Sequence, residues 1–126
     1  MTRFVADEPA DRRKLFVEAI VAHRNRASPH VTIEVEVDEG PAPWVQFADG
    51  RINADCTEAE LEELKTLLGR FPAFKIDELT RPDDAEGVNV RVSAKADPNR
   101  IAGFIDTAFR EVYGLPEGYR AWVVAI

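Results

Sequence analysis

The chain has 126 residues, of which 45% are hydrophobic and 31% charged, with a formal net charge of −7 and one cysteine. This length accommodates one domain, over residues 1–126, and the composition excludes a disordered chain. One cysteine excludes an internal disulfide and a cysteine-rich zinc site. No apolar stretch approaches the ~18 residues of a membrane span, and no secretory signal is recognisable. We therefore expect a cytoplasmic protein with no membrane partner.

The charge balance argues against nucleic acid as a partner. Twenty-three acidic residues outnumber sixteen basic ones, whereas nucleic-acid binders usually carry the opposite excess because they neutralise phosphates. Only four of the basic residues are lysines. An acid excess with few lysines suits a salt-rich cytoplasm, where carboxylates keep the surface hydrated. A GC-rich genome that favours arginine codons explains the lysine count equally well.

The first expected element is a helix that Asp7 caps, with Pro9 in its opening turn. The dipeptide Ser28-Pro29 ends it. Residues 31–38 then alternate between apolar and polar side chains, which predicts a strand with one buried face and one wet, acidic face. The apolar stripe of the helix comprises Leu15, Phe16, Ala19, Ile20 and His23.

Residues 44–56 predict a β-hairpin. Asp49-Gly50 separates two strand-like runs and is a strong signal for a two-residue turn. Such a turn places the apolar residues of the two strands opposite one another, while Trp44 lies on the other face among polar residues. The expected pairs are Phe47 with Ile52 and Val45 with Ala54.

The second half of the chain predicts two helices and three strands. Thr57 and Glu60 form a capping box for one helix, and Asp97-Pro98 opens another with a cap and a proline in its first position. A short strand is expected over residues 74–76, and an alternating strand over residues 88–96. Residues 119–126 predict a last strand that is apolar on both faces.

The expected order of elements is α-β-β-β-α-β-β-α-β. Hairpin connections dominate, so the fold class is α+β, with a mainly antiparallel sheet and three helices packed on one face. This order resembles the secretion-chaperone-like architecture, in which a helix, three strands, a helix, two strands and a helix follow one another, with a strand appended here.

Two runs of sequence resemble a family of small uncharacterised haloarchaeal proteins. They are residues 71–82 and residues 87–101, and the segments 44–49 and Leu115-Pro116-Glu117 fit the same pattern. The resemblance covers most of the chain and favours the salt-adapted interpretation of its acidic charge. The family has no assigned activity, so the resemblance implies no catalytic residues.

No Gly-rich phosphate loop, Rossmann fingerprint, nucleophile elbow or metalloprotease motif occurs. We therefore expect no catalytic residue, no cofactor and no metal. Cys56 precedes a helix N-terminus, which can stabilise a thiolate, but the nearby acidic residues disfavour a second negative charge, so a buried structural role is expected. His23 and His30 form no close ligand set with carboxylates, and we expect His23 to be structural.

One set of residues suggests an anion site. Ser93 and Lys95 share a strand face with Arg91, and a serine beside a lysine can act as a nucleophile with its base. Together with Arg100, these residues would serve a small-ligand sensor or an enzyme with a pocket between sheet and helices. The alternative for the same row is a solvated or interface face.

The aromatic residues suggest a different function. Large aromatic side chains exposed on a sheet are typical of protein interfaces, and Trp44 and Trp122 are expected on such faces, with Val123 on the opposite side of the last strand. The competing interpretation is that other parts of the chain cover them. The leading hypothesis is a non-enzymatic protein-binding, adaptor or chaperone-like module, with a second copy of itself, in a homodimer, as the expected partner.

Overall fold

A computed structural model describes residues 5–26, 30–83 and 86–125. The element order is the expected one with a single addition, because a two-residue strand, β1, precedes the first helix. Ser28, Pro29 and Ile126, where the first helix and the last strand were expected to end, lie outside the described residues. The elements are β1 (Val5–Ala6), α1 (Pro9–Arg26), β2 (Val31–Val35), β3 (Trp44–Ala48), β4 (Arg51–Cys56), α2 (Glu58–Leu68), β5 (Phe74–Thr80), β6 (Val88–Ala94), α3 (Pro98–Glu111) and β7 (Ala121–Ala125).

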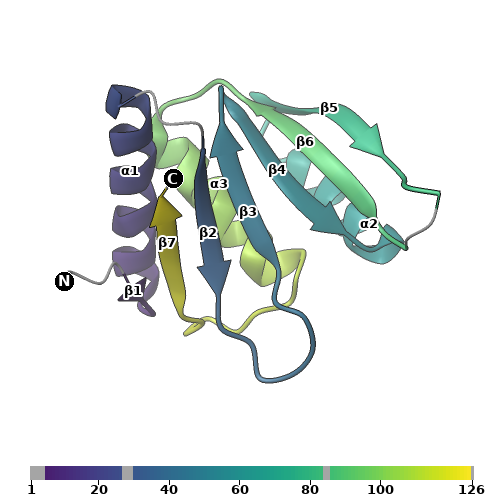
Figure 1. Cartoon of the computed structure of the whole chain (residues 1–126), viewed down its shortest axis with the longest axis horizontal. Helices are drawn as coiled ribbons and strands as arrows, with labels where there is room; N and C mark the ends of the chain where they lie inside the picture. The colour runs from purple at the N-terminus through teal and green to yellow at the C-terminus, as the bar shows by residue number, and fades with distance from the viewer. Residues whose placement is uncertain (1–4, 27–29, 84–85, 126) are drawn as a thin grey trace.

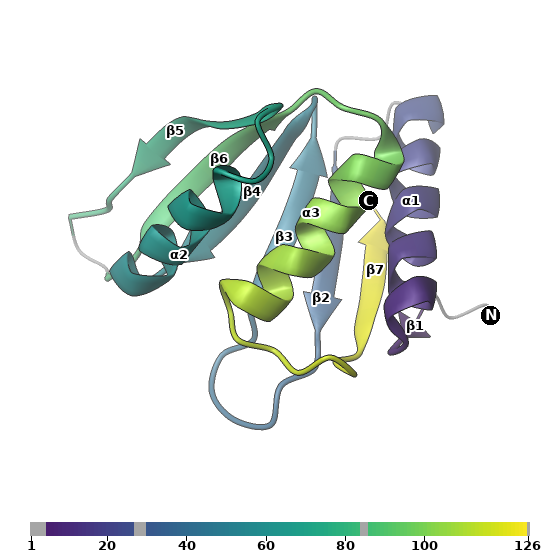
Figure 2. The same cartoon turned by 180° about the vertical axis from the view of Figure 1, so that it is seen from behind.

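The seven strands form one sheet in the order β1-β7-β2-β3-β4-β6-β5, and every neighbouring pair is antiparallel (Figure 1). The three helices pack on one face, where α3 crosses the middle of the sheet, α2 covers β4 and β6, and α1 follows the edge near β1 and β7 (Figure 2). The expected α+β fold, with helices on one face of an antiparallel sheet, is therefore confirmed.

The hairpin of β3 and β4 has the register expected from its turn. Val45 pairs with Ala54, and Phe47 pairs with Ile52. Asp49 has a φ of 52° and Gly50 a φ of 73°, and positive φ at both central residues is what a type I′ turn requires. A two-residue turn thus fixes which residues of β3 point toward the helices and which point away.

The two later helices begin as the sequence predicts. The Thr57 hydroxyl accepts a hydrogen bond from the Glu60 N–H at 3.0 Å, and the Glu60 carboxylate accepts one from the Thr57 N–H at 2.8 Å, which completes the capping box. The Asp97 carboxylate accepts a hydrogen bond from the Arg100 N–H at 3.0 Å, one residue before Pro98 opens α3. Both caps satisfy backbone donors that a helix start otherwise leaves unpaired.

The first helix begins one residue later than expected. The Arg12 N–H donates to the Glu8 carbonyl at 2.8 Å, so Glu8 occupies the cap position and Pro9 the first helical position. The prediction that Asp7 caps this helix is wrong. Its backbone carbonyl instead accepts a hydrogen bond from the Arg12 side chain at 2.8 Å, which ties the start of the chain to α1.

The hydrophobic core fills the space between the sheet and the helices. Helix α3 contributes most to it, because nearly every side chain on its inner side is buried. Phe104 meets Phe74 of β5 and Phe71 edge to face, with ring centroids 4.8 and 5.1 Å apart. The buried α3 residues are Ile101, Ala102, Phe104, Ile105, Asp106, Ala108 and Phe109.

The last edge strand, β5, is longer than the sequence indicated. It runs over Phe74–Thr80, with a register shift between Ile76 and Glu78 against β6. The acidic residues after Ile76 have low strand propensity, which is why only residues 74–76 were expected. A β-bulge accommodates the extra residue, Asp77.

Candidate functional site: the open face of the sheet

The candidate site is the face of the sheet that no described helix covers, here called the open face (Figure 1). Strand residues alternate between this face and the core, and those on the open face are exposed or half-buried. Its residues are Thr32 and Glu34 of β2, Trp44, Gln46 and Ala48 of β3, Arg51, Asn53 and Asp55 of β4, Lys75, Glu78 and Thr80 of β5 with Asp77 at the bulge, Asn89, Arg91 and Ser93 of β6, and Trp122 and Val124 of β7.

Both tryptophans lie on the β7–β2–β3 half of the open face. Glu34 is the cross-strand partner of Trp122 on one side and of Trp44 on the other. The Trp122 indole N–H donates a hydrogen bond to the Glu34 carboxylate at 2.9 Å, which satisfies the polar edge of the ring and leaves its apolar surface on the face. Val5 and Val124 beside them are 43% and 37% exposed. The tryptophan half is therefore a largely apolar surface built around one carboxylate.

The β4–β6–β5 half of the open face is polar and internally paired. Arg51 forms an ion pair with Asp77 at 2.9 Å, and Arg91 lies 3.6 Å from Glu78. The Asn89 amide donates to Asn53 at 2.8 Å and to Asp55 at 2.9 Å. Most charges in this half are therefore balanced by neighbours on the same face.

The structure places the residues considered for anion binding in separate environments. Arg91 and Ser93 lie on the open face of β6, where Arg91 is paired with Glu78. Lys95 follows the end of β6, and Arg100 lies in the first turn of α3; both are exposed. A cavity of about 20 Å³ does lie between the sheet and the helices, but it is lined by apolar side chains with Cys56 and Tyr113, and by none of these four residues.

The interface candidates divide between the two faces of β7. Trp122 points to the open face, whereas Val123 pairs with Ile33 and packs partly buried against the core on the helix side. Strand β7 lies between β1 and β2, so its hydrogen-bonding edges are both paired over part of their length. Both side-chain rows of β7 are apolar, as expected. The row with Val123 packs on the core, and the row with Trp122 lies on the open face.

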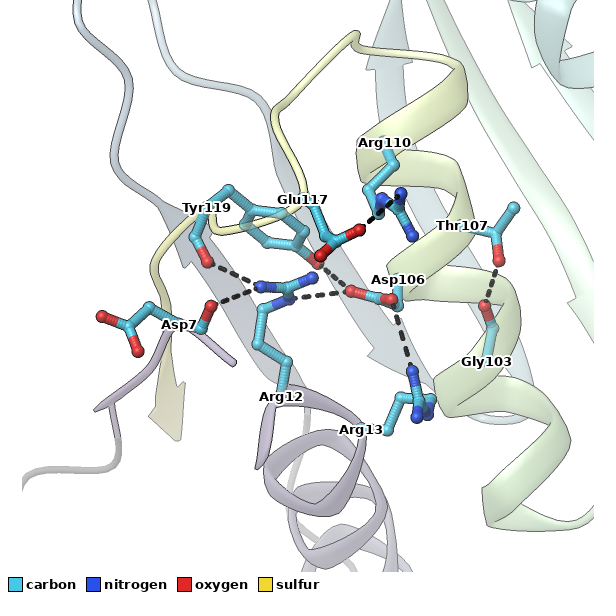
Figure 3. Close-up of polar contacts among 9 residues, drawn as sticks. All are labelled: Asp7, Arg12, Arg13, Gly103, Asp106, Thr107, Arg110, Glu117 and Tyr119. Atoms are coloured by element: carbon cyan, nitrogen blue, oxygen red, sulfur yellow. Dashed lines mark hydrogen bonds and ion pairs between the residues drawn. The ribbon is translucent and has the colours of Figure 1, made fainter. Parts of the chain in front are cut away.

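A buried polar cluster joins both ends of the chain to α3 (Figure 3). The Arg12 side chain is 0% exposed, and its Nε donates to the Asp106 carboxylate at 2.9 Å. Its Nη1 donates to the backbone carbonyls of Asp7 at 2.8 Å and Tyr119 at 2.9 Å. The Tyr119 hydroxyl donates to the same Asp106 oxygen at 2.7 Å. One guanidinium therefore ties together the start of the chain, α3 and the approach to β7.

The cluster is almost, but not fully, satisfied. Arg12 Nη2 is buried without a hydrogen-bond partner in the described part of the chain. The guanidinium lies 3.8 Å from the centre of the Tyr119 ring, so a cation–π contact offsets part of that cost. Burial and the hydrogen bond to Asp106 raise the pKa of Tyr119 far above its ordinary value, so this hydroxyl remains a donor at all physiological pH.

This cluster was not predicted from the sequence. Arg12 lies one helical turn before Phe16 and two before Ile20, on the buried side of α1. The sequence signal for a buried arginine was that Arg12, a charged residue, has the helical spacing of the apolar stripe of α1. A buried arginine requires a buried acid, and Asp106 occupies the corresponding position among the apolar residues of α3.

We predict that the Arg12–Asp106 pair shows strong coupling in a double-mutant cycle. Arg12→Met leaves the buried Asp106 with only the half-exposed Arg13 at 4.0 Å as a counter-charge, and Asp106→Leu leaves Arg12 buried without a counter-charge. Either change alone should therefore lower the free energy of unfolding by about 3–5 kcal/mol. The double variant should recover most of that loss. Urea unfolding followed by circular dichroism measures all four proteins. Additive losses in the double variant would contradict a coupled buried pair.

Cys56 is buried and belongs to the wall of the small cavity rather than to an exposed reactive site. Its sulfur lies 3.6 Å from the Tyr113 hydroxyl, which donates to the Asp55 carbonyl at 2.7 Å. Burial, followed by the charges of Glu60 and Asp55, raises the pKa of the Cys56 thiol. The thiol is therefore protonated and inert at neutral pH, which agrees with the structural role expected for it.

We predict that native Cys56 reacts slowly with iodoacetamide at neutral pH and that Cys56→Ser costs about 1 kcal/mol of stability. Because its pKa is raised in the folded state, the unfolded thiol ionises first, and the free energy of unfolding should fall as pH rises above about 8.5. Cys56→Ala should lack this part of the alkaline loss. Rapid alkylation of the folded protein would indicate an exposed thiolate instead.

Other kinds of site find no support in the described ranges. No group of three or more histidine, cysteine, aspartate or glutamate side chains there could hold a metal ion. His23 is buried with its ring edge-on to Phe47, 5.5 Å between centroids, which agrees with a structural role. Among the same residues, no helix is both long enough and apolar enough to cross a lipid bilayer.

The fold and the site define a small α+β protein whose helices all lie on one side of an antiparallel sheet, with an aromatic and polar surface on the other. The chain belongs to DUF7975, a family of unknown function, whose model matches residues 1–126. No curated protein and no solved structure matches it significantly. Likeness to an uncharacterised family is thus confirmed, whereas a haloarchaeal origin and the secretion-chaperone-like architecture stay predictions.

Proposed function

We propose that this protein is a non-enzymatic protein-binding module, of the adaptor or chaperone-like kind, which acts in the cytoplasm and docks its partner on the open face of the sheet. A second copy of the chain is one such partner. The observation that supports this most is that Trp44 and Trp122, the only tryptophans in the chain, both lie on the face without helices.

The physical properties of the surface support docking of a protein. Tryptophan is enriched at the centres of interfaces, because its large flat ring excludes much water at little cost in side-chain entropy. Here the rings stand on strands whose other side packs on the core, so a partner meets a rigid surface. A rigid surface loses little conformational entropy on binding. The free and buried Cys56 also fits a reducing compartment such as the cytoplasm.

We predict that variants on the two sides of β7 have different effects. The wild-type chain should associate to a dimer at micromolar concentration in sedimentation equilibrium. Trp122→Ala should shift this equilibrium toward monomer with little effect on folding, because Trp122 stands on the open face. Val123→Glu should instead lower the free energy of unfolding by about 1–3 kcal/mol, because it brings a charge against the core.

Two results would contradict the proposal in different ways. A wild-type chain that stays monomeric throughout the micromolar range would exclude a second copy as the partner. A dimer that Trp122→Ala leaves intact would place the contact elsewhere on the molecule. The urea midpoint of Trp122→Ala serves as the control that the variant remains folded.

A further inference from the structure

Indole rings and carboxylates alternate along one line across the open face. Trp122 of β7, Glu34 of β2 and Trp44 of β3 are cross-strand neighbours. Continuing the β3–β4 register by one residue from the pair Val45–Ala54 places Asp55 opposite Trp44. We call these four residues, Trp122, Glu34, Trp44 and Asp55, the indole–carboxylate row. It crosses four neighbouring strands, a distance of about 14 Å.

Glu34 and Asp55, the two carboxylates of the row, differ from the carboxylates of β5 on the same face. Asp77 and Glu78 each lie within 4.0 Å of an arginine. Within the described chain, Glu34 and Asp55 have no such cation and accept hydrogen bonds from neutral donors only, the Trp122 indole at 2.9 Å and the Asn89 amide at 2.9 Å. The row therefore carries two negative charges that no side chain among the described residues balances.

This combination of groups defines the chemistry of its partner. A guanidinium or ammonium group is attracted to the face of an indole, and it pairs with a carboxylate through charge-assisted hydrogen bonds. A surface that places each indole beside an unbalanced carboxylate provides both contacts to the same cation. The net charge of −7 attracts cations toward the protein from a distance.

We propose that the indole–carboxylate row binds an extended, arginine- or lysine-rich segment of a partner protein. This rests on the proposed function and names the partner chemistry of the same face. A row of about 14 Å matches about four residues of extended chain at about 3.3 Å per residue. The segment lies across β7, β2, β3 and β4, with its cations between the indoles and beside Glu34 and Asp55.

The test uses a short capped peptide of alternating serine and arginine, titrated into the full chain. Both tryptophans of the protein belong to the row, so intrinsic tryptophan fluorescence reports on this site alone. The expected result is a saturable change in emission that weakens at high salt, because part of the attraction is electrostatic. The same peptide with citrulline in place of arginine, which has the shape without the charge, should cause no saturable change.

Matched variants distinguish the effect of the charges in the row from the effect of the protein's net charge. Glu34→Gln and Asp55→Asn each remove one charge from the row, and the glutamine keeps an acceptor for the Trp122 indole. Each should weaken peptide binding about three- to tenfold, through the loss of an ion pair beside an aromatic ring. Glu78→Gln and Asp77→Asn make the same change in charge on the paired half of the face and should alter the affinity less than twofold.

Each contrary result has a distinct meaning. An equal loss in all four variants would show attraction to net charge only and would overturn the basic-segment proposal. An emission unaffected by the arginine peptide would overturn it as well. If the chain still dimerises and Trp122→Ala still abolishes the dimer, the protein-binding function survives with a second copy as the occupant of the row. If neither peptide binding nor dimerisation occurs, both proposals fail.

Discussion

The buried guanidinium of Arg12 is the interaction on which the arrangement of the chain ends depends. It donates to backbone carbonyls at residues 7 and 119, which flank β1 and β7, and to a carboxylate on α3. A buried arginine tolerates few alternative positions, because each lost hydrogen bond leaves a charge poorly solvated. The cluster therefore specifies where β7 begins, and with it the position of Trp122 three residues later.

Because successive side chains of a strand point to opposite faces, one face of the sheet is apolar and the other is mixed aromatic and polar. On the helix side, β-branched and aromatic residues meet α3 and exclude water from the core. On the open side, arginines of β4 and β6 pair with acidic residues of β5, and the other half carries both tryptophans beside Glu34, which forms no ion pair within the described residues. On the proposed docking surface, such a difference between the two halves would orient a bound partner.

Features that depend on local sequence were predictable. The Asp49-Gly50 turn fixed the hairpin register and the face of Trp44, and the caps at Thr57 and Asp97 located two helix starts. Features that depend on distant residues were not. Arg12 and Asp106 are ninety-four positions apart, so neither residue alone indicates that a buried pair forms. The strand β1 was missed because a two-residue strand has no periodicity, and its pairing with Trp122 is a tertiary contact.

The two edge strands of the sheet affect whether it can pair with strands of other molecules at high protein concentration. One edge is a strand of two residues, and the other, β5, carries a bulge at Asp77 and charged side chains along its exposed length. Short, bulged and charged edges are the devices by which sheets resist pairing with another strand. Open-ended growth into fibres by strand addition is thereby disfavoured at both ends.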